Sequence, residues 1–190
     1  MDARTVLGVI AIAATTCALA ACQATSTHIH QEHYTVTTKQ LEPYACGAIK
    51  RLHGCEDILL ASQPTPADFE QAKQLGVKSV INQRPIAEMD GFDEQACVTG
   101  LGMDYANPAF NGTDELTDAK INETIELLRT AQRPILMHCA SANRTGAIWF
   151  AYRAIDGGLT VEDALAEGKT VGLRSGAYEQ IVRDYIARHK

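Results

Sequence analysis

The residues with the clearest chemical capability lie together in the segment HCASANRTG, which spans residues 138–146. Within it, four residues separate Cys139 from Arg144. A cysteine thiolate is a strong nucleophile, and an arginine is always charged and offers a planar fork that holds a tetrahedral oxyanion through two hydrogen bonds. The pair therefore predicts attack on phosphorus or on a comparable anionic centre, with Cys139 as the nucleophile and Arg144 as the anion clamp.

The position of this segment between two predicted elements favours a catalytic role. Residues 135–138 have the pattern of a buried strand, and AIWFAYRAI after Gly146 is compatible with a helix. Ligands of open α/β sheets bind beyond the carboxyl ends of the strands, and the N–H groups of a loop that enters a helix favour an anion and an ionised thiol. We expect the binding ring to comprise Ala140, Ser141, Ala142 and Asn143. The alternative is a packed thiol at a strand end, with Arg144 as a surface charge.

Strands and helices alternate along the rest of the chain. Short apolar runs predict strands at 58–61, 77–82, 103–106 and 135–138. Helical spacing of apolar residues predicts helices that begin near Thr65, Asp93, Thr117, Gly146, Thr160 and Ser175. Gly76 and Gly168 are the expected ends of the helices that begin at Thr65 and Thr160. The alternation predicts an α/β fold with a mostly parallel central sheet flanked by helices, in one domain over residues 43–190.

The composition excludes several classes of protein. The chain has 190 residues, of which 46% are hydrophobic and 21% charged, so it has enough apolar surface to form a core. Its net charge of −6 argues against nucleic-acid binding, which needs clusters of Lys and Arg to neutralise phosphates. The sequence has no run of 18 uninterrupted apolar residues, so it predicts no membrane-spanning helix. It also has no pattern that predicts a metal or organic cofactor.

The N-terminal segment has the pattern of a bacterial export signal. One positive charge precedes an apolar, Ala- and Thr-rich run, which ends in Leu-Ala-Ala-Cys at residues 19–22. This ending resembles a bacterial lipobox, which implies a signal peptide over 1–21 and lipidation of Cys22. Gln23 after that cysteine implies an outer-membrane anchor on the periplasmic side, with residues 22–42 as a tether. An ordinary secretory signal or a short buried helix is the alternative. His28, His30 and His33 of the tether are expected to be solvated rather than to bind metal.

Export changes the interpretation of the cysteines. In an oxidising compartment, Cys46 and Cys55 are candidates for a disulfide that closes a short loop, although four cysteines allow three pairings. Cys97 has the simpler interpretation of a small buried hydrophobic residue. An accessible thiolate at Cys139 is also expected to be easily oxidised, either to sulfenic acid or to a disulfide with Cys97.

The segment HCASANRTG resembles the active-site loop of the cysteine phosphatases, in which five residues usually separate Cys from Arg. Four-residue loops occur in rhodaneses and in the small bacterial proteins called beta-lactamase-hydrolase-like, phosphatase-like. The chain is most similar to the latter family over residues 56–155, through ASQPTPADFEQAKQLGVKSVINQRP and RPILMHCASANRTGAIWFAYR. The resemblance implies a dual-specificity-phosphatase-like fold, with Cys139 as nucleophile and Arg144 as clamp. It also implies that Thr145 hydrogen-bonds the sulfur, that His138 orients the loop and that Arg84 lines the cleft.

Two departures from the family pattern stand out. Ala142 occupies a position where the family usually has Gly, so the turn must form without that residue's freedom at positive φ. Cysteine phosphatases also use an Asp about thirty residues before the Cys to protonate the leaving group, and 32 residues before Cys139 the chain has Asn107. Asp104 and Asp114 are the nearest acids, and Asp114 is the candidate general acid because its loop is expected to face the cleft.

Three functions are therefore compatible with the sequence. The first is a lipid-anchored, phosphatase-like hydrolase that acts on a phosphorylated substrate through a cysteinyl-phosphate. The second is a rhodanese-like sulfurtransferase that carries a persulfide on Cys139, which the four-residue spacing favours. The third is a non-catalytic module that binds an anion or a partner, which the missing acid favours. The flanking His138 and Thr145-Gly146 favour the phosphatase.

Overall fold

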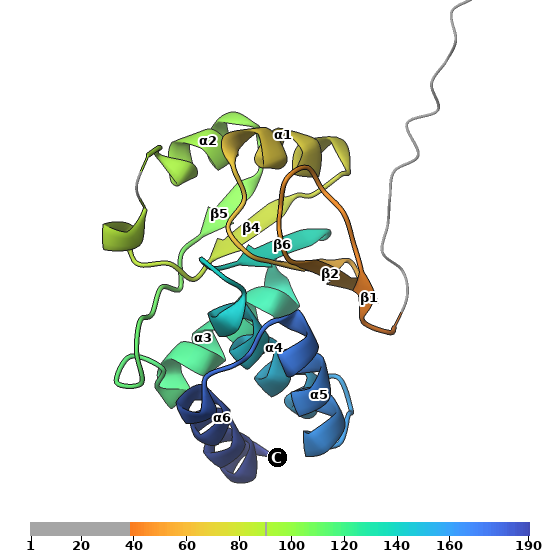
Figure 1. Cartoon of the computed structure of the whole chain (residues 1–190), viewed down its shortest axis with the longest axis vertical. Helices are drawn as coiled ribbons and strands as arrows, with labels where there is room; N and C mark the ends of the chain where they lie inside the picture. The colour runs from red at the N-terminus through yellow and green to blue at the C-terminus, as the bar shows by residue number, and fades with distance from the viewer. Residues whose placement is uncertain (1–38, 90) are drawn as a thin grey trace, which may run out of the picture. The chain divides into compact units, whose positions relative to one another are not determined.

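The computed structural model of this chain describes residues 39–89 and 91–190 (Figure 1). The predicted signal peptide, Cys22, the three tether histidines and most of the tether lie outside the described residues. Among the described residues, no helix has the length and apolar character needed to cross a membrane.

A six-stranded mixed sheet forms the centre of the domain, and its strand order is β1-β2-β3-β6-β4-β5. β3 pairs in parallel with β6, β6 with β4 and β4 with β5, whereas β1, β2 and β3 pair antiparallel. The strands are β1 (Glu42–Pro43), β2 (Leu52–Cys55), β3 (Ile58–Ala61), β4 (Ser79–Asn82), β5 (Asp104–Ala106) and β6 (Ile135–His138). The predicted mostly parallel α/β sheet is confirmed.

Helices cover both faces of the sheet (Figure 1). α1 and α2 pack on one face against Leu59, Val80 and Leu136, and α3 to α6 pack on the other against Leu60, Ile81 and Met137. This division follows from the alternation of side chains along each strand, which directs successive apolar residues to opposite faces. The helices are α1 (Pro66–Gln74), α2 (Glu94–Gly100), α3 (Asp118–Thr130), α4 (Asn143–Ile155), α5 (Val161–Val171) and α6 (Gly176–His189), with a short 3-10 turn η1 (Ile86–Glu88).

The strand register brings three strand ends together. His138 at the end of β6 lies opposite Ala61 of β3 and Asn82 of β4. Gln63, Gln83 and Cys139 follow shortly after these strands, so the connections that leave them meet at one edge of the sheet. This edge is where parallel α/β sheets form their sites.

The local helix signals are largely confirmed. The side chains of Thr65, Thr117, Thr160 and Ser175 each accept a hydrogen bond from a backbone N–H in the first turn of the following helix. The antiparallel pair β1 and β2 was not predicted, and Glu42 belongs to β1 rather than to the tether. Both strands are short, and β2 contains Gly and His, so neither has a strong strand pattern.

Gly168 does not end α5, as the sequence suggested, but lies inside it. A Cβ added to Gly168 would lie 2.8 Å from the Gly146 carbonyl oxygen and 2.9 Å from the Phe150 Cβ. The residue is therefore glycine because α4 and α5 approach closely at this point.

The free energy of unfolding of a Gly168→Ala variant is expected to be about 2–3 kcal/mol lower than that of wild type, because the added methyl group forces two packed helices apart. At a helical position with free space around it, replacing glycine with alanine instead raises the free energy of unfolding, because alanine has the higher helix propensity. Gly100→Ala, at the end of α2 with nothing within 4 Å of the added Cβ, is the matched control and is expected to be neutral or slightly stabilising. Urea unfolding of both variants measures the difference, and equal stabilities would contradict the close-approach explanation.

The predicted disulfide between Cys46 and Cys55 is wrong in this structure, where both thiols are free and buried. The two cysteines belong to separate cores, Cys46 to the one beneath α1 and α2, and Cys55 to the one beneath α3 to α6. The Cys46 thiol instead donates to the Asp68 carbonyl oxygen at 3.6 Å. Burial raises the pKa of each thiol to about 11, so both are protonated at neutral pH.

Candidate active site

The candidate site is the connection between β6 and α4, which we call the catalytic loop (Cys139–Arg144). Cys139 follows β6 directly, and α4 begins at Asn143. The first N–H groups of a helix have no intrahelical partner and carry a partial positive charge, so this end of α4 can hold an anion. Cys139 has a relative exposure of 1% and Arg144 of 7%, so both side chains are almost completely buried.

Ala142 makes the turn into α4 in the left-handed conformation, with φ 65° and ψ 7°. The turn thus has the geometry that glycine favours, although the residue is alanine. The space for its methyl group comes from Gly172, where an added Cβ would lie 2.9 Å from the Ala142 Cβ. The chain therefore accommodates alanine in the loop by having glycine at position 172.

Arg144 is held by groups from two other segments. Its Nη1 donates to Glu88 Oε1 at 3.0 Å and to the Phe110 carbonyl oxygen at 2.9 Å, and its Nη2 donates to Glu88 Oε2 at 2.5 Å. Although burial alone would lower the pKa of Arg144, the Glu88 hydrogen bonds and the nearby Cys139 sulfur raise it. Neither Glu88 nor Phe110 contacts the Nε atom of Arg144.

Glu88 also connects Arg144 to Arg84, which the sequence placed in the cleft. Arg84 Nε lies 3.8 Å from Glu88 Oε2, and Arg84 Nη1 donates to Gln63 Oε1 at 2.6 Å. A further hydrogen bond runs from Arg84 Nη2 to the Glu88 carbonyl oxygen. The hydrogen bond from Arg144 lowers the pKa of Glu88, so this carboxylate is charged at neutral pH. Arg84 thus lies beside the site and supports the residue that holds Arg144.

A buried carboxylate fixes His138 beneath the loop. His138 Nε2 lies 3.0 Å from Glu94 Oε1, and both side chains are almost completely buried. Glu94 also accepts hydrogen bonds from Gln63 Nε2 at 2.8 Å and from the Tyr105 hydroxyl at 3.3 Å. Burial alone would raise the pKa of Glu94, but these donors, His138 first, lower it. This network fixes the imidazole orientation, and the loop-orienting role expected of His138 stays a prediction.

A Glu94→Gln variant is expected to lose about 2–3 kcal/mol of unfolding free energy at pH 7, because a buried acceptor of three hydrogen bonds is replaced by a mixed donor and acceptor. The pKa of Glu94 is lower in the folded protein than its usual 4.5, so its stabilising contribution is complete above that pH. The contribution is lost as the pH falls through the folded-state pKa.

Urea unfolding at pH 7 and at pH 3.5 tests this expectation. The difference in unfolding free energy between wild type and Glu94→Gln is expected to be smaller at the lower pH. Glu123→Gln, which removes an exposed partner of Lys120, is the control and is expected to change stability by less than about 0.5 kcal/mol. A gap that is unchanged or wider at low pH would show that Glu94 does not act as a buried carboxylate.

Thr145 is turned towards β3 and β4. Its hydroxyl lies 3.3 Å from the Ala61 carbonyl oxygen and 3.1 Å from Gln83 Oε1, and it has one proton to donate to either. The structure therefore differs from the expectation that this hydroxyl bonds the Cys139 sulfur. Thr145 here attaches the first turn of α4 to the ends of the neighbouring strands.

The side chains of Ser141 and Asn143 hold the loop from outside. Arg174 Nη2 donates to Ser141 Oγ at 2.6 Å, and Asn143 Oδ1 accepts from the backbone N–H groups of Arg174 at 2.8 Å and Ser175 at 3.1 Å. The Ala140 carbonyl oxygen accepts from the Gln63 backbone N–H at 3.3 Å. These residues thus fix the shape of the loop, so any contribution to an anion comes from their backbone N–H groups.

The two candidate acids and Asn107, which stands at the usual position of the acid, lie in different parts of the fold. Asp104 begins β5 opposite Ser79, at the amino end of the parallel strands, and is therefore on the wrong edge of the sheet. Asn107 donates to the carbonyl oxygens of Asn82 and Arg84 and so closes the end of β4. Asp114 is exposed and accepts a hydrogen bond from Thr113, in the same connection whose Phe110 carbonyl oxygen contacts Arg144.

Four residues of the site were not predicted from the sequence, namely Gln83, Glu88, Glu94 and Arg174. Gln83 and Glu88 belong to the connection from β4 to α2, Glu94 begins α2, and Arg174 belongs to the connection from α5 to α6. No sequence spacing relates them to Cys139. The only available signal was the Arg84-Pro85 dipeptide, which marks the end of β4 and hence the edge of the sheet. Within 39–89 and 91–190, no group of three His, Cys, Asp or Glu side chains is placed to hold a metal ion.

Comparison with known proteins adds family evidence to this geometry. The family model for the phosphatase-like domain of beta-lactamase hydrolase-like proteins matches residues 52–155. The beta-lactamase hydrolase-like protein of Agrobacterium fabrum is 31% identical over 121 residues, which are 62% of this chain and 28% of that protein. Its namesake from Xylella fastidiosa Temecula1 is 29% identical over 125 residues, or 64% of this chain and 29% of that protein. The chain therefore spans less than a third of the length of these relatives.

Solved structures show the same fold. A DUF442 protein from Shewanella putrefaciens CN-32 has a TM-score of 0.65 and 22% identity, over 75% of this chain and 95% of its own. TpbA of P. aeruginosa has a TM-score of 0.62 and 20% identity, over 80% of this chain and 91% of its own. At these identities the likeness shows the fold, which is that of the cysteine phosphatases.

Proposed function

Because this chain belongs to the family of the phosphatase-like domain of beta-lactamase hydrolase-like proteins, we propose that it is a cysteine-dependent hydrolase of phosphate monoesters. The observation that carries the proposal is the placement of Cys139 beside Arg144 at the amino end of α4. Solved neighbours of the same fold include a cysteine-to-serine variant of TpbA in complex with pTyr and PTPMT1 in complex with PI(5)P, both phosphorylated ligands.

The proposed reaction has two steps. The Cys139 thiolate attacks phosphorus, so that an S–P bond forms and the bond from phosphorus to the ester oxygen breaks, and the leaving alcohol takes up a proton. Water then attacks the cysteinyl-phosphate, the S–P bond breaks, and inorganic phosphate leaves with regeneration of the thiolate. In both steps, charge on the equatorial oxygens is stabilised by the loop N–H groups and by the Nε edge of Arg144.

Asp114 remains the proposed general acid, since its connection contacts Arg144 through Phe110. An acid matters little for an aryl phosphate, whose leaving group is stable as an anion, and much for an alkyl phosphate. An Asp114→Asn variant that hydrolyses alkyl phosphates as fast as wild type would remove Asp114 from this role.

A paired assay of the full chain tests the proposal. Phosphate release from an aryl phosphate is measured beside thiocyanate formation from thiosulfate and cyanide. Hydrolysis of the aryl phosphate alone supports the phosphatase. Thiocyanate formation alone would support the sulfurtransferase, which the four-residue spacing between Cys139 and Arg144 favours. If neither reaction occurs but sulfate or phosphate binds, the chain is an anion-binding module.

We also propose that the mature protein is attached to the periplasmic side of the outer membrane through acyl chains on Cys22. The support is the sequence Leu-Ala-Ala-Cys followed by Gln23, and the segment lies outside the described residues. Mass spectrometry of the mature N-terminus tests this proposal, since an unmodified chain that begins at Met1 would exclude both cleavage and lipidation.

A further inference from the structure

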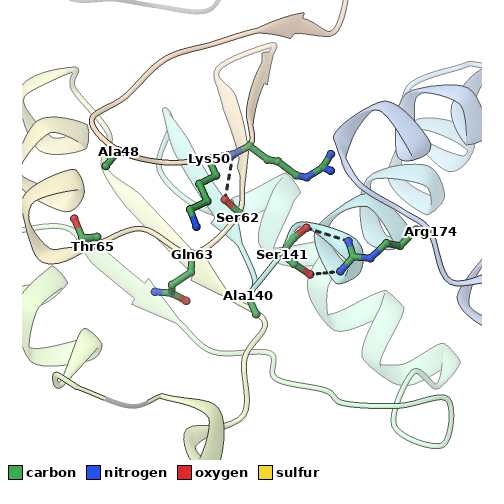
Figure 2. Close-up of a pocket in the computed structure, with 9 residues that line it drawn as sticks. Ala48, Lys50, Ser62, Gln63, Thr65, Ala140, Ser141 and Arg174 are labelled. Carbon is green, nitrogen blue, oxygen red and sulfur yellow. Dashed lines mark hydrogen bonds between the residues drawn. The ribbon is translucent and has the colours of Figure 1, made fainter.

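A cavity of about 610 Å³ borders the catalytic loop on the side of β3 and of the segment that precedes β2 (Figure 2). Ala140 and Ser141 of the loop form part of its wall. Three cations also line it, namely Lys50, Arg51 and Arg174. Figure 2 shows the Lys50 side chain directed towards Gln63, and Arg174 turned to Ser141.

The charge of this cavity is unbalanced. No carboxylate is among its lining residues. Lys50 and Arg51 are exposed, and neither has an ion pair with an acid among residues 39–89 and 91–190. The Arg174 guanidinium donates hydrogen bonds to Ser141 and to the Gly172 carbonyl oxygen, both of which are neutral groups. Three uncompensated cations around one hollow, in a chain with a net charge of −6, form a local field that attracts anions.

The cavity is within reach of a substrate held in the catalytic loop. Ser141 is two residues from Cys139, so their Cα atoms are at most about 7 Å apart. The Gln63 backbone N–H, which bonds the Ala140 carbonyl oxygen at 3.3 Å, also ties the cavity wall to the loop. The loop and the cavity therefore share the wall formed by Ala140 and Ser141, and a single ring is the spacer that we choose to join two anions in a probe molecule.

We propose that the cavity binds a second phosphate of the substrate, and that the preferred substrates are phosphate monoesters whose leaving group carries another phosphate. This inference rests on the proposed function, because the first phosphate is the one attacked by Cys139. Lys50 and Arg51 have their charges free for the second phosphate, while Arg174 contributes charge and holds Ser141 in the shared wall.

The test compares two aryl phosphates with the same reacting group. Phenyl phosphate has one anion, and 4-(phosphonomethyl)phenyl phosphate carries a second anion that cannot be hydrolysed. The full chain is expected to show about tenfold higher kcat/KM for the second compound, from two partly exposed ion pairs. Because these pairs are solvent-accessible, the preference is expected to weaken when KCl is raised from 0.05 to 0.5 M.

Charge-removing variants connect this preference to the cavity. In a Lys50→Gln, Arg51→Gln double variant, the ratio of the two kcat/KM values is expected to fall to about one or two. Lys78→Gln removes an exposed cation at the amino end of β4, on the opposite edge of the sheet, and is expected to keep the full ratio. Melting temperatures of all variants check that the fold is retained.

The outcomes separate this inference from the proposed function. Hydrolysis of both compounds at equal kcat/KM would overturn the second-phosphate site and leave the phosphatase intact. If neither compound is hydrolysed, the proposed function fails. Calorimetric titration of both compounds then tests whether the cavity binds an anion. Tenfold tighter binding of the two-anion compound, lost in the double variant, would support the cavity as an anion site, whereas equal binding of both compounds would overturn it.

Discussion

Phosphatase activity on an aryl phosphate is expected to fall by at least about 10⁴-fold in a Cys139→Ser variant, because a serine hydroxyl is hardly ionised at neutral pH and the loop has no general base to activate it. The loop itself is expected to persist, since Cys139 is buried and serine differs from it by one atom. Binding of inorganic phosphate is therefore expected to remain while turnover is lost. Initial rates and calorimetric titration of the same preparation measure both quantities.

The matched control for this variant is Cys97→Ser. Cys97 is a half-buried residue of α2 with a free thiol, and it packs at the edge of the core beneath α1 and α2. Its replacement is expected to leave kcat/KM within about twofold of wild type. Activity that survives in Cys139→Ser would exclude both the phosphatase and the sulfurtransferase, because each requires the sulfur of this residue.

An Arg144→Lys variant is expected to lose about 10²–10³-fold in kcat/KM while keeping its positive charge. Glu88 and Phe110 hold the Nη1 and Nη2 groups of Arg144, and the proposed reaction uses its Nε edge for the phosphate. A lysine ammonium is a point charge without this fork, so it can satisfy Glu88 or an oxyanion but cannot align with both. The loss is of the size found when one donor to a developing oxyanion is removed.

Arg129→Lys provides the comparison for Arg144→Lys. Arg129 also makes a two-pronged contact, to Asp156 at 2.7 and 2.8 Å, but it is exposed on α3. Its replacement is expected to leave the kinetic constants unchanged. If Arg144→Lys retained more than a tenth of wild-type kcat/KM, charge alone would explain the role of Arg144, and the fork geometry would have no part in it.

The local structure of this protein can be predicted from its sequence because the signals are short-range. Thr65 with Pro66, and Thr117 before a helical apolar stripe, are cap patterns that complete themselves within four residues. The buried strand at 135–138, followed at once by Cys139 and a helix, likewise lies in one continuous stretch. For this reason the α/β class and the position of the loop could be derived without a structure.

The partners of that loop were decided by tertiary structure alone. Glu88 is 56 residues from Arg144, Glu94 is 44 residues from His138, and Arg174 is 33 residues from Ser141. No periodicity relates such positions, because they meet only when the strand register brings several connections to one edge of the sheet. The same reason explains the wrong disulfide, since the face of the sheet on which Cys46 and Cys55 lie depends on packing.

Two glycines show most clearly where prediction from local sequence patterns fails. Gly76 and Gly168 both follow a helical apolar pattern, and the sequence predicts a helix end at each. Gly76 has φ 93°, a conformation that ends α1, whereas Gly168 lies within α5 and is glycine because α4 approaches closely there. The amino-acid sequence determined which segments fold locally and which loop carries the nucleophile. Only the packing of distant segments decided what surrounds that loop, because contact between them depends on the whole fold rather than on neighbouring residues.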